Sequence, residues 1–250
     1  MTLSHDRTGS GPAVLLLHST VCDRRMWDPQ VGALAAAGWQ VVRCDLPGFG
    51  ETPAPDRPVD TAAEVAGLLD ALGIGPAAVV GSSGGGAVAL ELAARWPHRV
   101  TALALLCTAS AGLEPGPALR AVWDRENELL DAGDVGAATE LMVTTWLGPR
   151  ADDQTRDLVR RMQRHAYEVQ LTAGDVEEVE TPYETTAVRA RTLLVTGAHD
   201  LPEFRQVALA LAGTLPAARH VELDWAGHLP GLEDPEPVNA LLLEFLHPTA

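Results

Sequence analysis

The sequence predicts an α/β fold with a mostly parallel, twisted sheet of about seven strands flanked by helices. Two observations lead to this prediction. Short aliphatic runs, of which AVLLLH at residues 13–18 is the clearest, alternate along the chain with longer segments of helical periodicity. Most of the short runs are apolar throughout, without alternation, as expected of strands that are covered on both faces. The pattern therefore favours a parallel sheet between two layers of helices.

The individual elements follow from the same pattern. The expected strands are residues 13–18, 40–44, 78–81, 100–106, 192–196 and 219–223, with room for one more strand before residue 13. The expected helices lie near residues 30–37, 61–72, 84–95, 204–213 and 236–246.

One segment breaks the alternation. Residues 112–187 contain no strong strand pattern and are predicted to form three helices, near residues 117–131, 135–146 and 154–171. We therefore expect a core made of residues 1–111 and 188–250, with residues 112–187 inserted as a small helical cap (lid).

Composition excludes several classes of function. The formal net charge of −16 disfavours binding to nucleic acid or to an anionic membrane surface. The chain contains no lysine, which excludes Schiff-base and pyridoxal enzymes and the P-loop type of phosphate binder. The remaining expectation is a protein that acts on a small molecule.

Cysteine usage and the N-terminus give a prediction about location. Cys22, Cys44 and Cys107 are an odd set at scattered positions, which predicts neither a disulfide framework nor a zinc site. The N-terminal segment lacks a basic and then apolar secretory signal, and no apolar stretch approaches the span of a bilayer. We expect a cytoplasmic protein that uses no metal and no cofactor.

The strongest chemical signal is Gly81-Ser82-Ser83-Gly84-Gly85, which fits G-x-S-x-G between an apolar strand and an Ala/Leu-rich helix. In that setting the central serine lies on a sharp turn, and the N–H groups at the start of the helix face a developing negative charge. The register of the motif selects Ser83 as nucleophile rather than Ser82.

A serine hydroxyl needs a base, and the base needs an orienting acid. His228 follows the last expected strand, and Asp200 follows the strand before it, so the chain order is Ser…Asp…His. Both lie at the carboxyl edge of a parallel sheet, where open α/β sheets carry their sites. Glu114, which follows the preceding strand, is the alternative acid.

Two N–H groups are needed to stabilise the oxyanion. The Gly84 amide directly follows the nucleophile, and the second donor is expected at Thr20, in preference to Ser19, after the first core strand. His18 ends that strand and is expected to hold the loop. A metal site is the competing interpretation of the histidines, but no ligand spacing such as HxxxH supports it.

The segments LLLHST, DLPGFGET, GSSGG, TGAHD and AGH together resemble the α/β-hydrolase superfamily over essentially the whole chain. HSTVCDRRMWDPQ and the small cap look closest to the 3-oxoadipate enol-lactonase-like and small-esterase branch. The resemblance implies a catalytic triad of Ser83, Asp200 and His228, with Gly84 and Thr20 as oxyanion donors.

The chain departs from the family pattern at two positions. His18-Ser19 replaces the usual His-Gly, and Gly84 stands where relatives often carry a larger side chain. By the same resemblance, Ser83 excludes the branches that use an aspartate nucleophile, namely the haloalkane dehalogenases and epoxide hydrolases.

The cap is expected to close over Ser83, and four tryptophans are candidates to line the pocket: Trp27, Trp123, Trp146 and Trp225. Arg24 and Arg25 are candidates to bind one substrate carboxylate. The expected activity is hydrolysis of a small to medium-sized, mainly apolar ester or lactone through an acyl-enzyme. Hydrolysis of a β-diketone C–C bond, thioester cleavage, perhydrolysis, a lyase, isomerase or cyclase of natural-product biosynthesis, and a ligand-binding regulator remain open alternatives.

Overall fold

The computed structural model describes residues 2–110, 115–173, 176, 179, 181–215 and 217–247. Within these residues, seven strands form one sheet in the order β1-β3-β2-β4-β5-β6-β7. The strands are β1 (His5–Thr8), β2 (Ala13–Leu17), β3 (Gln40–Cys44), β4 (Ala77–Ser82), β5 (Val100–Leu106), β6 (Arg191–Gly197) and β7 (Ala218–Leu223). Strand β1 runs antiparallel to β3, and the other neighbouring strands are parallel. The predicted fold class is confirmed, including the single strand before residue 13.

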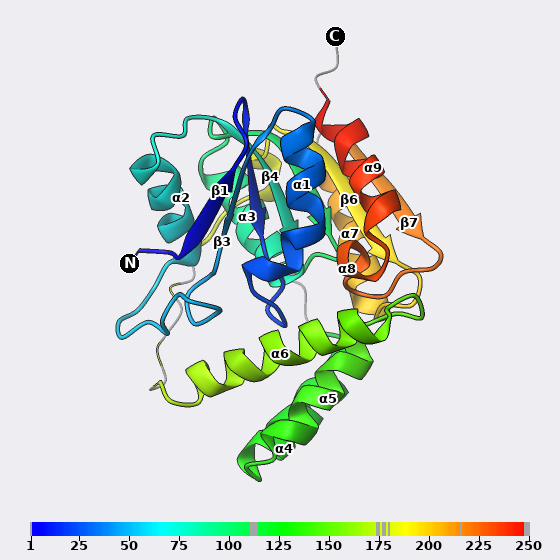
Figure 1. Cartoon of the computed structure of the whole chain (residues 1–250). Helices are drawn as coiled ribbons and strands as arrows, with labels where there is room; N and C mark the ends of the chain where they lie inside the picture. The colour runs from blue at the N-terminus through cyan, green and yellow to red at the C-terminus, as the bar shows by residue number, and fades with distance from the viewer. Residues whose placement is uncertain are drawn as a thin grey trace.

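Helices cover both faces of the sheet (Figure 1). In β2, Val14 and Leu16 belong to an apolar cluster that includes buried residues of α1 (Asp28–Ala36) and α9 (Pro235–Leu246). Leu15 and Leu17 belong to the cluster that includes α2 (Thr61–Ala71), α3 (Gly84–Arg95) and α7 (Pro202–Thr214). Because successive side chains of a strand point to opposite faces, a strand covered on both sides is apolar at every position.

Three further helices form the cap, which lies at one end of the core (Figure 1, green). They are α4 (Pro117–Asp131), α5 (Val135–Trp146) and α6 (Asp153–Gln170), close to the three predicted ranges. The carboxylates of Asp134 and Asp152 accept backbone N–H groups at the starts of α5 and α6, which are the usual cap interactions. Residues 111–114, 174, 175, 177, 178 and 180 lie outside the described residues, so the exact division between core and cap stays a prediction.

The remaining elements are short. They are the 3₁₀ turns η1 (Arg24–Trp27) and η2 (Thr185–Ala187) and the helix α8 (Pro230–Glu233). In the part of the chain that the structure describes, no helix combines the length and the apolar character needed to cross a membrane.

Candidate active site

Ser83 occupies the turn between β4 and α3, as the motif predicts. Its backbone has φ 53° and ψ −119°, a conformation that a residue with a side chain rarely adopts. Such a residue stores strain of about 1–3 kcal/mol, so its surroundings must hold it in place. The Ser83 N–H donates to the Leu106 carbonyl at 3.0 Å, and the Ser83 carbonyl accepts the Gly86 and Ala109 N–H groups at 2.9 and 3.1 Å.

The glycines of the motif permit close contacts between backbone segments. A Cβ on Gly81 would lie 2.4 Å from the Gly85 carbonyl oxygen, and a Cβ on Gly85 would lie 2.3 Å from the His18 carbonyl oxygen. The motif also distinguishes its two serines: Ser82 is the buried last residue of β4, whereas Ser83 lines a cavity. This geometry favours Ser83 over Ser82 as the nucleophile.

His228 and Asp200 form a buried pair. The His228 Nδ1 lies 2.8 Å from the Asp200 Oδ2, and both side chains are 2% exposed. The second oxygen of Asp200 accepts the Leu201 N–H at 2.7 Å. Because a carboxylate is the acceptor, the proton is assigned to Nδ1, which leaves the Nε2 lone pair available as a base. Glu114, the alternative acid, lies outside the described residues.

The loops that carry the acid and the base are bonded to each other. The N–H groups of Ala198 and His199 donate to the carbonyls of Leu223 and Ala226, each at 2.9 Å. The loop after β6 is therefore fixed to the loop after β7, and the separation of acid and base depends on backbone bonds as well as on their own hydrogen bond.

Glu233 is a site residue that the sequence reasoning missed. Its carboxylate accepts the N–H groups on either side of the base, from Gly227 at 2.8 Å and from Leu229 at 3.1 Å. The N–H of His228 itself donates to the Trp146 carbonyl at 3.0 Å. Burial raises the pKa of the Glu233 carboxyl above its usual range, although these backbone donors act in the opposite direction. Three consecutive N–H groups around the base thus have acceptors.

Two aromatic side chains pack against the imidazole of His228. The ring centroid of Phe204 lies 4.3 Å from that of His228, and the centroid of Trp146 lies 4.5 Å away. Phe204 comes from α7 of the core, and Trp146 is the last residue of the cap helix α5. Because both residues also line the cavity that contains Ser83, they connect the expected base, His228, to the cavity of the expected nucleophile.

The expected oxyanion donors are adjacent. A Cβ on Gly84 would lie 2.5 Å from the Cγ2 atom of Thr20, so the side chain of Thr20 occupies the space beside Gly84. The alternative donor, the Ser19 N–H, is directed to the sulfur of Met26 at 3.2 Å. The arrangement therefore favours Thr20 over Ser19.

His18 holds the loop that carries Thr20. Its Nδ1 lies 2.8 Å from the Ser19 carbonyl oxygen, and its Nε2 accepts the Leu46 N–H at 2.9 Å. These roles require the neutral imidazole with its proton on Nδ1. Burial lowers the pKa of His18, which favours the same neutral form. The residue joins the loop after β2 to the loop after β3, in agreement with its expected structural role.

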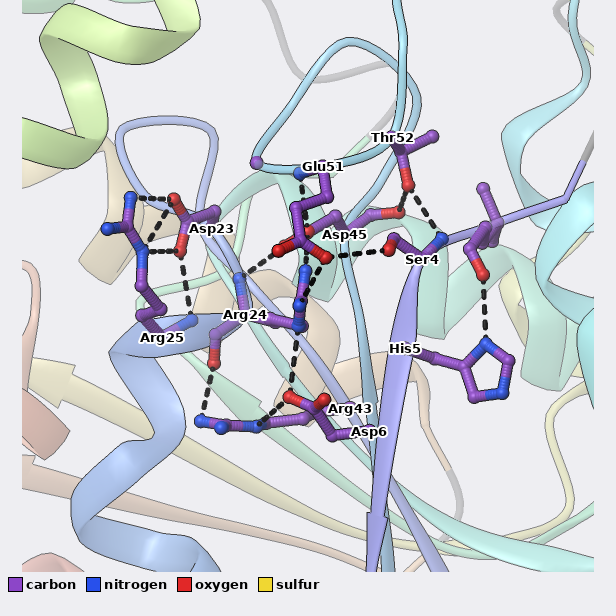
Figure 2. Close-up of polar contacts among 12 residues, drawn as sticks. Ser4, His5, Asp6, Asp23, Arg24, Arg25, Arg43, Asp45, Glu51 and Thr52 are labelled. Carbon is purple, nitrogen blue, oxygen red and sulfur yellow. Dashed lines mark hydrogen bonds and ion pairs between the residues drawn. The ribbon is translucent and has the colours of Figure 1, made fainter.

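Arg24 and Arg25 are engaged in ion pairs, and the expectation that they bind a substrate carboxylate is corrected. Figure 2 shows Arg24 among three carboxylates, those of Asp6, Asp45 and Glu51. Burial disfavours the charged form of Arg24, but these partners raise its pKa overall. Arg25 pairs with Asp23 at 2.6 Å. The network fastens β1, η1 and the loop after β3 together.

Ser83 lines a cavity of about 310 Å³ together with Thr20, Gly84, Trp123 and Trp146. A larger, more open cavity of about 850 Å³ adjoins it. The residues common to the two linings are Thr20, Gly84, Ala109 and Ser110. The expected oxyanion donors thus lie where the two cavities meet.

The other two candidate tryptophans do not line either of these cavities. Trp27 is fully buried in the core cluster together with Met26. Trp225 is half-buried and packs beneath the guanidinium of Arg150, 4.7 Å from the ring centroid. The expectation that they form part of the pocket wall is therefore corrected. Loop position alone did not reveal that the Trp27 side chain turns into the core.

A metal-binding interpretation of the site fits its chemistry less well. Potential ligand atoms of Cys107, Asp200 and His228 lie within 4.8 Å of one another. Burial is the main cause that raises the pKa of the Cys107 thiol well above its usual range, and it is the thiolate that binds metals. Since Asp200 and His228 are already paired, the cluster fits an acid–base pair better than a metal centre.

Comparison with known proteins agrees with the fold. A profile of the family described as alpha/beta hydrolase fold matches residues 12–235. Among solved structures, a malate-bound thermophilic esterase from Thermogutta terrifontis is 29% identical, with a TM-score of 0.83 over 98% of this chain and 92% of that chain. An enol-lactonase from Burkholderia xenovorans LB400 is 27% identical, with a TM-score of 0.80 over 98% and 96% of the two chains.

Curated relatives match a shorter stretch. Bifunctional epoxide hydrolase 2 of Sus scrofa is 37% identical over 105 residues, which are 40% of this chain and 19% of that protein. In this and similar curated relatives, the matched stretch covers between 19% and 42% of the relative's own length.

Proposed function

The chain belongs to the α/β-hydrolase fold family, and on that premise we propose that it is a serine hydrolase of small to medium-sized, mainly apolar esters or lactones. The observation that carries the proposal is the combination of Ser83, in a strained strand–helix turn that lines a cavity, with the buried His228–Asp200 pair. The esterase and the enol-lactonase with similar structures support the same class of substrate.

The first half of the reaction forms an acyl-enzyme. The Ser83 Oγ attacks the carbonyl carbon while the His228 Nε2 takes the hydroxyl proton, and the carbonyl π electrons move onto oxygen. The N–H groups of Gly84 and Thr20 stabilise that oxyanion. When the carbonyl re-forms, the bond to the leaving oxygen breaks, and His228 returns the proton to the departing alcohol.

The second half uses water as the nucleophile. His228 takes a proton from water, the hydroxide oxygen attacks the acyl carbon, and the Ser83 oxygen leaves with the proton from His228. Asp200 stabilises the imidazolium in both halves and keeps the Nδ1–H tautomer. In a lactone the leaving alcohol stays attached to the acyl chain, so the product is a single hydroxy acid.

Rapid-mixing kinetics with 4-methylumbelliferyl butanoate test the proposal. We expect a burst of methylumbelliferone equal to the enzyme concentration when hydrolysis of the acyl-enzyme is slower than its formation. Ser83→Ala should lose the burst and at least about 1,000-fold in kcat. Ser82→Ala is the matched control, because it removes the hydroxyl of the adjacent buried serine, and it should retain both. Ester hydrolysis by Ser83→Ala at the wild-type rate would show that the reaction does not pass through an acyl-enzyme on Ser83.

A further inference from the structure

Glu203 lines the smaller cavity, and the proposed mechanism does not use it. It belongs to the first turn of α7 and is 9% exposed. Its Oε1 accepts the N–H of Leu119 at 3.1 Å, which caps the start of the cap helix α4. Its Oε2 is buried and has no hydrogen-bond partner within the part of the chain that the structure describes.

The capping role accounts for only one of the two oxygens. Gly116 leaves room for the capping oxygen, since a Cβ on Gly116 would lie 2.3 Å from the Glu203 Oε1. A buried carboxylate oxygen without a partner is unfavourable, because it has lost its hydration and gained no hydrogen bond in exchange. The fold therefore leaves one carboxylate oxygen without a partner among the described residues, and a group in the cavity reaches that oxygen only when the Glu203 carboxylate turns toward the cavity that the residue lines.

The surroundings of Glu203 define which group would fit. Among the described residues that line the smaller cavity, Glu203 has the only charged side chain, and its neighbours there include Leu119, Trp123 and Phe204. A carboxylate oxygen accepts hydrogen bonds, and it does so most strongly in a water-poor setting. An apolar group placed beside the Glu203 carboxylate would leave Oε2 unsatisfied, and a substrate carboxylate would be repelled.

We propose that the Glu203 carboxylate turns its unpartnered oxygen toward the cavity and accepts a hydrogen bond from a hydroxyl, amide or ammonium group on the substrate. This inference rests on the proposed function, because it places the substrate's carbonyl at Ser83. The two cavities meet at the oxyanion donors Thr20 and Gly84, so the two arms of an ester extend into different cavities. The donor belongs to the arm that enters the smaller cavity, and the substrates are esters or lactones with an N–H or O–H group in that arm.

Matched pairs of substrates test the inference, with kcat/KM as the readout. In the acyl arm, the heptanoate ester of 4-methylumbelliferone is compared with the 6-hydroxyhexanoate and 6-aminohexanoate esters, and the butanoate ester with the 3-hydroxypropanoate and 3-aminopropanoate esters. In the alcohol arm, pentyl acetate is compared with 4-hydroxybutyl acetate. Each pair replaces a terminal methyl by a donor of similar size, and the hydroxyl and ammonium members distinguish the two kinds of donor.

We expect wild-type enzyme to prefer the donor member by at least about tenfold in one arm, because an unsatisfied polar group in the site penalises the apolar analogue. Glu203→Gln keeps an acceptor for Leu119 but can replace Oε2 by an NH₂ group, so the preference should fall to about twofold or less. Glu203→Met offers no acceptor and should favour the methyl member. Asp134→Asn, which changes the carboxylate that caps α5, is the control and should keep the wild-type preference.

A purely structural role for Glu203 gives a different result, since both members of every pair would then lose the same factor. The inference would be overturned by such equal losses, and also by a preference for the donor member that is retained in both Glu203 variants. It would be overturned as well if the wild-type enzyme showed a ratio near one in both arms. If Ser83-dependent hydrolysis continues in that last case, the proposed function stands and only the role of Glu203 fails. Melting temperatures measured alongside show which variants remain folded.

Discussion

The indole ring of Trp146 lies 4.5 Å from the imidazole of His228, and the carbonyl of Trp146 accepts the N–H of the same residue at 3.0 Å. The last residue of the cap helix α5 therefore contacts the proposed base by both its backbone and its side chain. We therefore propose that the cap helps to position this base, in addition to lining the cavity.

Trp146→Ala should consequently impair hydrolysis of every ester. It removes a side chain that is 5% exposed, and such large-to-small changes cost about 3–5 kcal/mol of stability. Trp123→Ala is the matched comparison, because Trp123 also lines the cavity but is 43% exposed. It should alter mainly the ranking of acyl-chain lengths. Melting temperature and kcat/KM over a series of acyl chains separate the two effects, and a Trp146→Ala variant that changes only the ranking would contradict a positioning role.

Glu233→Gln should loosen the loop that carries His228. The amide keeps one acceptor oxygen, but its NH₂ group faces a backbone N–H that then loses its partner. We expect the free energy of unfolding to fall by about 1–3 kcal/mol, and kcat to fall about tenfold or more while KM changes little. Urea unfolding and steady-state kinetics provide the readouts.

Glu236→Gln is the control for this change, because Glu236 is exposed on the neighbouring helix α9. It should behave like wild type. The assignment of Glu233 as a positioning residue fails if Glu233→Gln is less stable but turns over substrate with an unchanged kcat.

Gly84 and Thr20 should be energetically coupled. Gly84→Ala places a Cβ 2.5 Å from the Thr20 Cγ2, so either the Thr20 side chain or the loop with this expected oxyanion donor must shift. Thr20→Ser removes that methyl and keeps the backbone N–H. We expect a loss of about tenfold in kcat/KM for Gly84→Ala, little change for Thr20→Ser, and substantial recovery in the double variant. Coupling of contacting residues is typically about 0.5–3 kcal/mol, and losses that simply multiply in the double variant would argue against the contact.

Acid should destabilise the protein through His18. Burial lowers the pKa of His18 below its ordinary value of 6.5, although the hydrogen bond to the Ser19 carbonyl and the charges of Asp45 and Asp23 partly oppose this. Below about pH 6.5 the unfolded chain binds a proton that the folded protein resists. The free energy of unfolding therefore falls as the pH falls from about 6.5 toward the folded pKa, by up to about 1.4 kcal/mol per pH unit, and is insensitive to His18 above this range.

Urea unfolding at pH 7.5, 6.5 and 5.5 measures this effect. The loss between the two lower values should be smaller in His18→Gln than in wild type. The pKa of His220 is also lowered by burial, but His220 is present in both proteins. The difference between them therefore measures the contribution of His18. Equal pH dependence in the two proteins would contradict the neutral, loop-holding role.

Much of the fold and part of the site could be predicted because they depend on local patterns. Strand β2 is apolar at each position because both of its faces are buried, so the pattern is visible in five consecutive residues. The turn at Ser83 needs small neighbours, and these appear as glycines in the sequence. The pairing of His228 with Asp200 follows from strands that end at the same edge of the sheet.

The residues that sequence reasoning missed, or assigned to the wrong surroundings, depend on how distant parts of the chain pack. Glu203 bonds a backbone group 84 positions away, and nothing near it in the sequence distinguishes it from a surface glutamate. Arg24 follows a polar loop, but its partners come from separate segments, at Asp6, Asp45 and Glu51. Trp27 belongs to a short turn, and its side chain enters the core. Such burial depends on how the elements pack, and no short pattern encodes it.

The central claim is that Ser83 is the nucleophile, and covalent labelling tests it most directly. The protein is treated with a fluorophosphonate, digested, and the modified residue is identified by tandem mass spectrometry. We predict one adduct per chain, on Ser83 and not on the adjacent Ser82, with labelling abolished in Ser83→Ala and retained in Ser82→Ala. An adduct on another residue, or unchanged labelling of Ser83→Ala, would contradict the proposed function.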